Sequence, residues 1–422
     1  MNPKRKILVP IFNRAHYGRL RPVLNAIKNH PNLDLKIIVG VPAAYGYFLK
    51  NIINSRPRSW FLALPWYMLA RIRSFLGKKY VFKNDFLARN LLADGFELEA
   101  YVPIFFDGGK SETMAKTAGF GLEKLTDEIR KIKPDVVFVN ADRFEMMAVA
   151  MVASYLNIPI AHNEGGDMSG TIDESVRHAI TKLAHIHFTS TESSRNRVIQ
   201  MGENPEKVFN VGSPAIDAIA NVDFKIRPDV FSKLDISKPY LLILAHPVTT
   251  ISSEENFKFA QNLISAIKEI SIPKIILGSN IDAGSDALGG VIKNWLEKEK
   301  PNNVFFTKTL HPDDFYKYLK YTACAVGNSS SFIREGAYFG TPVVLLGSRQ
   351  NNRERGDNIL EVIDNQKDSL RQAILTQINR GKFPVSNIFG GGDSALKIVD
   401  VFATVDLDIQ KVFHEIFISP VA

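Results

Sequence analysis

The order of apolar segments restricts the fold of this 422-residue chain more than any other feature. Short runs rich in β-branched residues alternate with longer stretches of helical periodicity, and this alternation occurs in two successive series. Repeated strand–helix–strand order predicts two parallel sheets, each covered by helices. The predicted strands span residues 6–12, 35–40, 98–106, 135–140, 158–162 and 186–189 in the first series, and residues 240–245, 274–278, 304–307, 323–327 and 342–346 in the second. Helical patterns at residues 18–29, 111–131, 144–156 and 254–269 separate them.

The length of the chain exceeds what one hydrophobic core normally organises, so we expect two domains. The weakly patterned stretch 212–238, interrupted by prolines, is interpreted as the linker. The predicted fold class is α/β, with two Rossmann-like domains whose strand C-termini face a central cleft. The assigned ranges are 1–213 for the first domain, 214–395 for the second, and 396–422 for a C-terminal helix expected to pack back on the first domain.

The net charge of +8 does not indicate a nucleic-acid partner, because the excess is local. Residues 50–92 contain nine lysines and arginines and one acidic residue, Asp85, so the rest of the chain sums to zero. The single cysteine, Cys324, has no partner for an internal disulfide, so a reducing compartment is expected. The apolar run 7–12 is too short for a signal peptide, which favours a cytoplasmic location.

Residues 162–182 gather ionisable side chains and three glycines directly after a predicted strand. Loops at strand ends are where α/β proteins place their chemistry, although a solvated loop could also be this charged. Glu164 leaves the strand, and Asp173 is expected to cap the helix that carries Arg177. On the same helix, His178 is equally well explained as a half-buried structural histidine.

Two further ionisable residues follow predicted strands. Asp142 comes directly after the apolar run 136–140, where it is either a positioned carboxylate or the N-cap of the next helix. His246 follows the first strand of the second domain, at the end expected to face the cleft. A lone histidine is usually structural, so both interpretations of His246 remain open.

Candidate anion-binding groups follow other strand ends. Arg14 and Arg19 flank a helix start after the first strand and could hold phosphate oxygens or belong to a surface turn. Three serines precede a helix in the second domain, where hydroxyls and backbone N–H groups form an anion site or merely cap the helix. The second-domain candidates are Ser329, Ser330 and Ser331, with Glu335 as a ribose acceptor, and the basic cluster Arg349, Arg353 and Arg355, which a solvated loop would also explain.

Carboxylates thus come mostly from the first domain and anion donors mostly from the second. This division suits a nucleotide-sugar, whose diphosphate is held by one half while the sugar faces acid–base groups of the other. No metal-ligand set is visible in the sequence, and no cofactor is expected.

Six segments taken in order resemble the UDP-N-acetylglucosamine 2-epimerase family, in its hydrolysing branch. These are RAHYGRLRPVL, ADRFE, HNEGGDMSGTIDESVRHAITKLAHIHF, HPVTT, GNSSSFIREG and GSRQNNRERGDN. The resemblance covers residues 5–45 and about 95–400, and implies the GT-B architecture. Enzymes of this branch make N-acetylmannosamine or a 2,4-diacetamido analogue for sialic-type acids.

The resemblance also implies a mechanism. The sugar loses its C2 proton and UDP leaves from C1 to give a 2-acetamidoglucal, to which water adds with C2 inverted. The implied acid–base groups are Asp142, Glu164 and Asp173, with His246 in the cleft, and a base among them is expected to gain basicity from burial. The implied UDP contacts are Arg14, Ser329, Ser330, Ser331, Glu335 and Arg349, and we add Arg177 as a substrate contact.

Departures from the family pattern limit what the resemblance implies. Ala141 stands where a glycine precedes the aspartate, and Phe332 where a glycine commonly follows the serines. Residues 46–94 are largely a basic, aromatic insertion, so the identity of the substrate is less secure than the reaction class. The uncharged run 59–70 could lie on an anionic membrane surface, but a packed helical hairpin or a dimer contact is favoured.

The expected partner is therefore a UDP-sugar, and the resemblance alone suggests a homodimer. The first alternative is a GT-B glycosyltransferase that passes the sugar of a UDP-sugar to an acceptor. A second alternative is a catalytically silent nucleotide-sugar binding protein.

Overall fold

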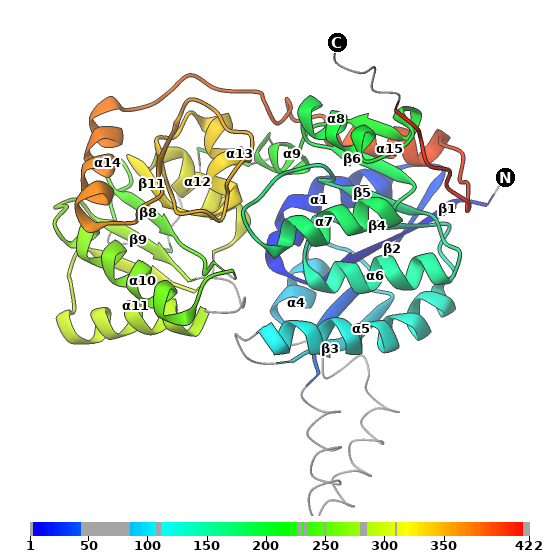
Figure 1. Cartoon of the computed structure of the whole chain (residues 1–422), viewed down its shortest axis with the longest axis horizontal. Helices are drawn as coiled ribbons and strands as arrows, with labels where there is room; N and C mark the ends of the chain where they lie inside the picture. Colours follow the sequence, from blue (N-terminus) through cyan, green and yellow to red (C-terminus); the bar gives the residue numbers. More distant parts are fainter. Residues whose placement is uncertain are drawn as a thin grey trace, which may run out of the picture.

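The computed structural model describes residues 3–43, 85–106, 111–220, 222–225, 230–231, 234–248, 250–278, 285–308 and 310–416. Two sheets organise these residues into two domains, which lie side by side (Figure 1). The first sheet has the strand order β3-β2-β1-β4-β5-β6-β7 and the second the order β10-β9-β8-β11-β12-β13. All of these neighbours pair in parallel, as the alternation of strands and helices predicted.

The strands of the first sheet are β1 (Arg5–Ile11), β2 (Leu33–Pro42), β3 (Ala100–Phe105), β4 (Val136–Asn140), β5 (Ile160–Asn163), β6 (Ile186–Thr189) and β7 (Val208–Asn210). Those of the second are β8 (Leu241–Leu244), β9 (Lys274–Leu277), β10 (Val304–Thr307), β11 (Cys324–Gly327), β12 (Val343–Leu346) and β13 (Ile359–Val362). Every predicted strand is present within about two residues. The sequence analysis missed β7 and β13.

Helices in the first half of the chain are α1 (Arg14–Asn29), α4 (Phe86–Ala93), α5 (Ser111–Ile132), α6 (Phe144–Tyr155), α7 (Ile172–Leu183), α8 (Glu192–Gln200) and the 3-10 helix η3 (Pro205–Lys207). Those in the second half are α9 (Pro214–Ala220), α10 (Ser253–Lys268), α11 (Ser285–Glu299), α12 (Pro312–Tyr321), α13 (Ser330–Phe339), α14 (Lys367–Arg380) and α15 (Ser394–Thr404). Local signals explain several boundaries. A capping box of Ser252 and Glu255 begins α10, and Gly340, with φ of 59°, ends α13 in the left-handed conformation.

Each sheet is buried on both faces. In the first domain, α1 and α15 cover one face and α5, α6 and α7 the other. In the second, α10, α11 and α14 cover one face and α9, α12 and α13 the other. This burial explains why strands such as β4, whose five residues are all buried, are apolar without alternation.

The C-terminal helix α15 packs on the first domain. Its Phe402 ring lies edge-on to Phe138 of β4 and Phe188 of β6, with centroid distances of 5.4 Å and 5.3 Å. The guanidinium of Arg5 donates to the carbonyl of Val405 at 2.9 Å, which satisfies the end of the helix. The assigned domain ranges remain our proposal, although the described helix begins at Ser394 rather than at residue 396.

Beyond α15, residues 405–416 run along the first domain. Lys411 donates to the carbonyls of Lys182 and Ala184 at 2.8 Å and 2.7 Å and pairs with the buried carboxylate of Glu203. The backbone N–H of His414 donates to the carbonyl of Gly202 at 2.9 Å. This segment is therefore anchored by a buried ion pair and by backbone hydrogen bonds.

The interpretation of residues 212–238 as a plain linker is wrong in its first part. Residues 214–219 of α9 are all buried, and the helix packs against α1 and α13. Pro214 is the first residue of this helix and marks a helix start rather than loose chain. The chain passes between the domains at Gly212 and again near Gly390, and the two passages are joined by a 2.8 Å hydrogen bond from the N–H of Ser213 to the carbonyl of Phe389.

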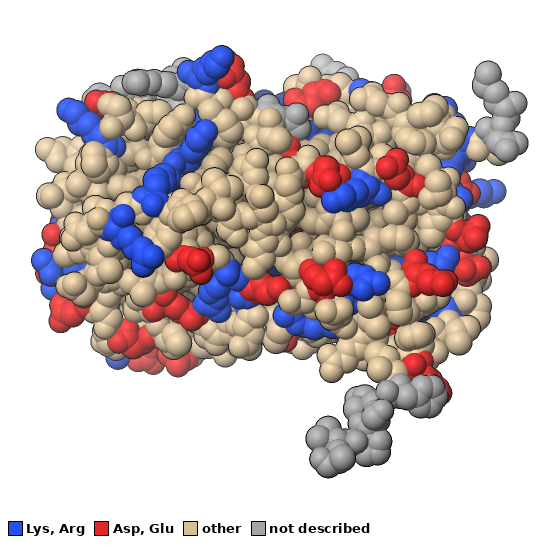
Figure 2. Space-filling view, turned by 90° about the horizontal axis from the view of Figure 1, so that it is seen from above, with Lys and Arg blue, Asp and Glu red and all other residues tan. Residues whose placement is uncertain are grey.

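Most of the predicted insertion 46–94, including the aromatic run 59–70, lies outside the described residues, and α4 is its described end. Within the described ranges, no helix is long and apolar enough to cross a bilayer. Acidic and basic side chains are interspersed over the face seen in Figure 2.

Candidate active site

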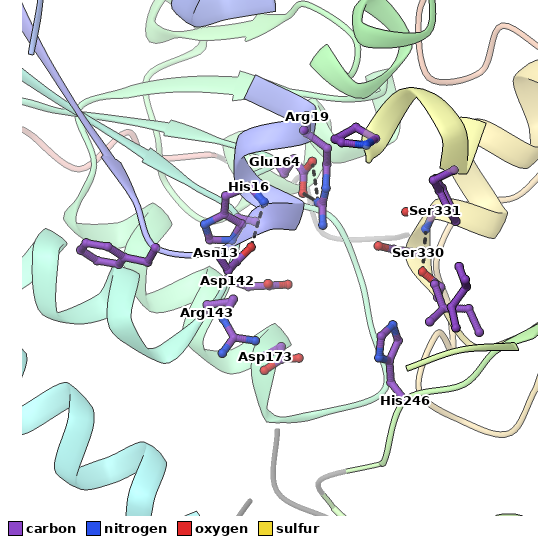
Figure 3. Close-up of a pocket in the computed structure, with 18 of the residues that line it drawn as sticks. Asn13, His16, Arg19, Asp142, Arg143, Glu164, Asp173, His246, Ser330 and Ser331 are labelled. Atoms are coloured by element: carbon purple, nitrogen blue, oxygen red, sulfur yellow. Dashed lines mark hydrogen bonds and ion pairs between the residues drawn. The ribbon is translucent and has the colours of Figure 1, made fainter. Parts of the chain in front are cut away.

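A cavity of about 540 Å³ lies between the two domains. Its walls come from the C-terminal ends of strands in both sheets, as the cleft prediction required. Figure 3 shows Asp142, Glu164 and Asp173 on the first-domain side and His246, Ser330 and Ser331 on the opposite side. Ten of the eleven predicted site residues line the cavity: Asp142, Glu164, Asp173, Arg177, His246, Ser329, Ser330, Ser331, Glu335 and Arg349. The eleventh, Arg14, is the first residue of α1, and its side chain is outside the described part of the structure.

Glu164 is a buried carboxylate held by arginines from both domains. It follows β5 with φ of 65°, a left-handed conformation that is costly for a residue with a Cβ atom. Nη1 of Arg19 lies 3.3 Å from both of its carboxylate oxygens, and Nη1 of Arg334 lies 3.1 Å from Oε1. Burial by itself raises the pKa of Glu164, but Arg334 and Arg19 outweigh it and hold the pKa at about 2. The expectation that burial makes a site carboxylate more basic is therefore wrong for Glu164.

Asp142 forms an ion pair with Arg177, whose side chain is 1% exposed. Arg177 also donates to the backbone carbonyl of Asp167, so its guanidinium is already engaged on two sides. The N-cap of α6 is Arg143 rather than Asp142, which removes the capping interpretation of Asp142. The expected role of Asp173 as a cap is also wrong, because Thr171 occupies that position and Asp173 lies in the first turn of α7.

His246 is fixed through its backbone. The side chain of Asn328 accepts from the N–H of His246 at 2.7 Å and donates to its carbonyl at 2.8 Å. This pair of bonds ties the segment after β8 to the segment after β11, beside the cavity. The imidazole lines the cavity while the residue is only 6% exposed.

The three serines have different positions at the start of α13. Ser329 is the N-cap, and its Oγ accepts from the N–H of Ser331 at 3.4 Å. The Oγ of Ser330 instead accepts from Nη2 of Arg334 at 3.3 Å. Capping therefore accounts for one serine, and the helix N-terminus faces the cavity with further hydroxyls, as an anion site requires.

The neighbours of this helix start are buried. Phe332 is fully buried in the core under α13, so its ring is part of the packing of the second domain and not of the cavity wall. Glu335 lines the cavity at 1% exposure, and burial raises its pKa. A buried, less acidic carboxyl at this place can exchange hydrogen bonds with hydroxyl groups.

The basic cluster after β12 is divided between two tasks. Arg349 reaches the cavity and donates to the carbonyl of Asn328 at 3.3 Å. Arg353 crosses to the first domain, where it donates to the carbonyl of Met168 at 3.0 Å, and Arg355 pairs with Glu361 at 2.8 Å. Arg349 and Arg353 therefore both line the cavity, as the prediction of a basic cluster required, whereas Arg355 does not and pairs within its own domain.

Two loops are joined closely across the cleft at this point. The N–H of Gly170 donates to the carbonyl of Arg349 at 3.0 Å. A Cβ atom added to Gly170 would lie 1.8 Å from the carbonyl oxygen of Ser348, so only glycine fits. The loop that carries Glu164 is thus held against the second domain.

The residues of the cavity wall that the sequence analysis missed include His16, Arg143 and Arg334. Burial lowers the pKa of His16 well below its usual value, so this histidine is neutral at physiological pH. Arg143 donates to Glu145 at 2.7 Å from the position next to Asp142. The spacing of four residues between Ser330 and Arg334 on a predicted helix was a signal that could have indicated their contact.

Two Rossmann-like domains that enclose a cavity with carboxylates on one wall and a serine-capped helix on the other define a GT-B-like protein with a nucleotide-sugar type of site. The chain belongs to the UDP-N-acetylglucosamine 2-epimerase family, since the model of that family matches residues 80–403. This confirms the resemblance inferred from the six sequence segments.

Individual relatives agree with this assignment. The chain is 33% identical over 412 residues to the UDP-N,N'-diacetylbacillosamine 2-epimerase (hydrolyzing) of Legionella pneumophila, covering 96% of this chain and 97% of the relative. It is 29% identical over 395 residues to the UDP-N-acetylglucosamine 2-epimerase of Neisseria meningitidis, covering 92% of each. Among solved structures, the UDP-GlcNAc 2-epimerase of Methanocaldococcus jannaschii in complex with UDP-GlcNAc and UDP matches with a TM-score of 0.72 at 19% identity, over 94% of this chain and 99% of that chain. The structural match supports the GT-B architecture.

Proposed function

We propose that this protein is a hydrolysing 2-epimerase of a UDP-linked 2-acetamido sugar. The observation that carries the proposal is the interdomain cavity in which Asp142, Glu164 and Asp173 face His246 and the start of α13. Family membership and the name of the Legionella relative support the same reaction.

The nucleotide is assigned to the second-domain wall. The diphosphate lies at the N-terminus of α13, where backbone N–H groups and serine hydroxyls donate to its oxygens. Arg349 and His246 add donors from the neighbouring strand ends, Arg14 adds a cation from the first domain, and Glu335 accepts from ribose hydroxyls. Negative charge on UDP grows as it departs, so these donors bind the transition state more tightly than the ground state.

The sugar is assigned to the first-domain wall. A carboxylate takes the proton from C2, the electron pair of that C–H bond forms the C1–C2 double bond, and the C1–O bond to UDP breaks with its electrons on UDP. Water then adds its hydroxyl to C1, and C2 regains a proton on the face opposite to the one that lost it. The products are UDP and the free sugar with C2 inverted.

The three carboxylates are expected to divide these tasks. The low pKa of Glu164 makes it a weak base, because proton acceptance falls with the pKa of the acceptor. We therefore assign the proton transfers to Asp142 and Asp173, and assign Glu164 to accept hydrogen bonds from the sugar as an anion. Arg177 is reassigned from substrate contact to positioning residue, since it pairs with Asp142.

The substrate is either UDP-N-acetylglucosamine or its 2,4-diacetamido analogue, and one experiment tests the reaction and decides between them. Each donor is incubated with the protein without an acceptor, UDP is quantified, and the sugar product is analysed by NMR. Equal amounts of UDP and of the free C2-inverted sugar are expected from one donor. The Asp142→Asn variant, tested in parallel, should release UDP about 10² to 10⁴ times more slowly, because it removes a proton-transferring carboxylate, while its UDP affinity stays within a few fold.

Other outcomes would favour another function. A glycosyltransferase would show no turnover until an acceptor is supplied. A silent binding protein would bind UDP and release no free sugar from either donor. The expected homodimer, the cytoplasmic location and the membrane contact through residues 50–90 remain predictions.

A further inference from the structure

Arg334 is a fully buried charged residue of the cavity wall that the proposed mechanism does not use. Its side chain is 0% exposed, although it belongs to α13 at the domain boundary. A buried guanidinium must be paired to offset its desolvation, so its partners show what it does.

One partner, Glu335, is the next residue of α13, with its Oε2 3.9 Å from Nε of Arg334. The other two partners lie in different domains. Nη1 lies 3.1 Å from Oε1 of Glu164, which we assign to the sugar. Nη2 donates at 3.3 Å to Oγ of Ser330, which we assign to the diphosphate. Because the guanidinium is planar and rigid, the position of one partner restricts that of the other.

The contact with Ser330 has a directional consequence. A hydroxyl has one hydrogen to donate and can accept bonds on its oxygen. Since Arg334 donates to Oγ, the hydrogen of Ser330 is directed elsewhere, and Ser330 lines the cavity at the helix N-terminus. A hydroxyl prepared in this way donates to an anion without first breaking a bond.

We propose that Arg334 is a positioning residue that couples the nucleotide half of the cavity to its sugar half, by orienting Ser330 for the diphosphate and Glu164 for the sugar with one guanidinium. The inference rests on the proposed function of the cavity and adds to it a link between binding of UDP and the state of Glu164. Arg19 cannot provide this link, because it pairs with Glu164 from within the first domain.

The link also affects the ionisation of Glu164. The charged and titratable groups facing this carboxylate are Arg334 of α13, Arg19 and His16 of α1, Arg353 of the loop after β12, His162 of β5, and the acidic neighbours Asp167 and Glu335. Removal of one of the two paired arginines raises the pKa of Glu164. Glu164 then becomes protonated at a higher pH than in the wild type.

The first experiment measures the UDP affinity of the wild type, Arg334→Met, Ser330→Ala and the double variant by calorimetry. Each single variant should bind UDP about tenfold more weakly, and the double variant should be hardly weaker than either, because both substitutions remove the same arrangement. Additive effects would overturn the proposal. This measurement needs no turnover, so it remains decisive if the epimerase reaction itself is absent.

The second experiment measures the pH dependence of UDP release. As the pH is lowered, the activity of Arg334→Met should begin to fall at a higher pH than that of the wild type, because Glu164 becomes protonated earlier. If the acid limb of the pH–activity profile is not shifted, the coupling to Glu164 is overturned. Arg21→Met is the matched control, because Arg21 also joins the domains, through Asp313 at 2.7 Å, but has neither of these partners. Equal effects of the two substitutions would mean that Arg334 only holds the domains together.

Arg334→Lys serves if the methionine variant does not fold. It keeps the charge near Glu164 but has no planar fork, so the acid limb should stay close to that of the wild type while UDP affinity still falls. Wild-type affinity in the lysine variant would overturn the proposal. If the wild-type protein neither binds UDP nor releases it from a donor, the proposed function is refuted. If the wild type does both but the losses of UDP affinity in Arg334→Met and Ser330→Ala are additive, only the coupling is refuted.

Discussion

Arg177 and Asp142 form an ion pair in which the arginine side chain is 1% exposed and the aspartate side chain is 20% exposed. The carboxylate therefore reaches the cavity while the guanidinium behind it is sealed from solvent. A second bond from Arg177 to the carbonyl of Asp167 fixes the arginine from the other side. The position of the Asp142 carboxylate is therefore set by Arg177.

Replacement of Arg177 by Met should therefore lower kcat and leave UDP binding almost unchanged. Misplacement of a reacting group by about 1 Å costs roughly 10²-fold in rate, and we expect a loss of that order. Arg349→Met is the control with the opposite expected pattern, because it should weaken UDP binding and have a smaller effect on kcat. Steady-state kinetics and UDP calorimetry on both variants check this, and a large loss of UDP affinity in Arg177→Met would restore its role as a substrate contact.

Replacement of Ala141 by Gly should stabilise the protein. Ala141 has φ of 61°, which costs a residue with a Cβ about 1–2 kcal/mol, whereas the extra freedom of glycine in the unfolded chain costs about 0.5–1 kcal/mol. The net gain in unfolding free energy is about 0.5–1 kcal/mol. Urea denaturation measures it against Ala148→Gly, a buried position of helix α6 where glycine should destabilise by about 1 kcal/mol or more. A destabilised Ala141→Gly variant would contradict the left-handed conformation.

Replacement of Gly170 by Ala should separate the two loops that meet across the cleft. The new Cβ would lie 1.8 Å from the carbonyl oxygen of Ser348, so the loop carrying Glu164 must move away. UDP release should fall by roughly 10²-fold. Gly119→Ala is the control, since a Cβ there meets nothing within 4 Å and helix α5 should gain up to about 1 kcal/mol. Unchanged turnover in Gly170→Ala would show that this contact does not position the site.

Stability at low pH should depend on Glu203. Burial raises the pKa of this carboxyl, but hydrogen bonds from His187, Lys182 and Lys411 prevail and lower it to about 2. Because this pKa is below the value of about 4.3 in the unfolded chain, the contribution of Glu203 is complete above that pH and is lost as the pH falls toward 2. The difference in unfolding free energy between wild type and Glu203→Gln should therefore shrink between pH 5 and pH 3.

Urea denaturation at the two pH values checks this, with the exposed Glu192→Gln as the control. A difference that stays constant with pH would mean that the ion pairs of Glu203 do not hold the segment 405–416.

The fold was largely predictable because its strands are buried on both faces and stand out as apolar runs. The two strands that were missed are short edge strands. β7 has three residues, and β13 has one fully buried residue of four, so neither has an unbroken apolar signal. Helix α9 was taken for linker because it is only seven residues long, begins at Pro214 and precedes a proline-interrupted stretch, and tertiary packing stabilises it.

The site was predictable to the extent that strand ends determine it. Asp142, Glu164 and His246 follow strands directly, and topology alone brings such residues to one edge of each sheet. The pairing of Arg177 with Asp142 and of Arg334 with Glu164 depends on side-chain direction and on how the two domains meet. Sequence spacing encodes neither, so the electrostatics of Glu164 could not be anticipated.

Because the chain crosses between the domains at Gly212 and again near Gly390, the second domain is inserted into the first, which acts as its host. The chain leaves the host after β7 and returns to it as α15, so the described ends of the polypeptide both lie on the host, at the right of Figure 1. An inserted domain of this kind can change in sequence and shape while the hydrophobic core of the host domain stays intact. If the nucleotide and the sugar are divided between the domains as we propose, new nucleotide preferences can evolve in the second domain without redesign of the first.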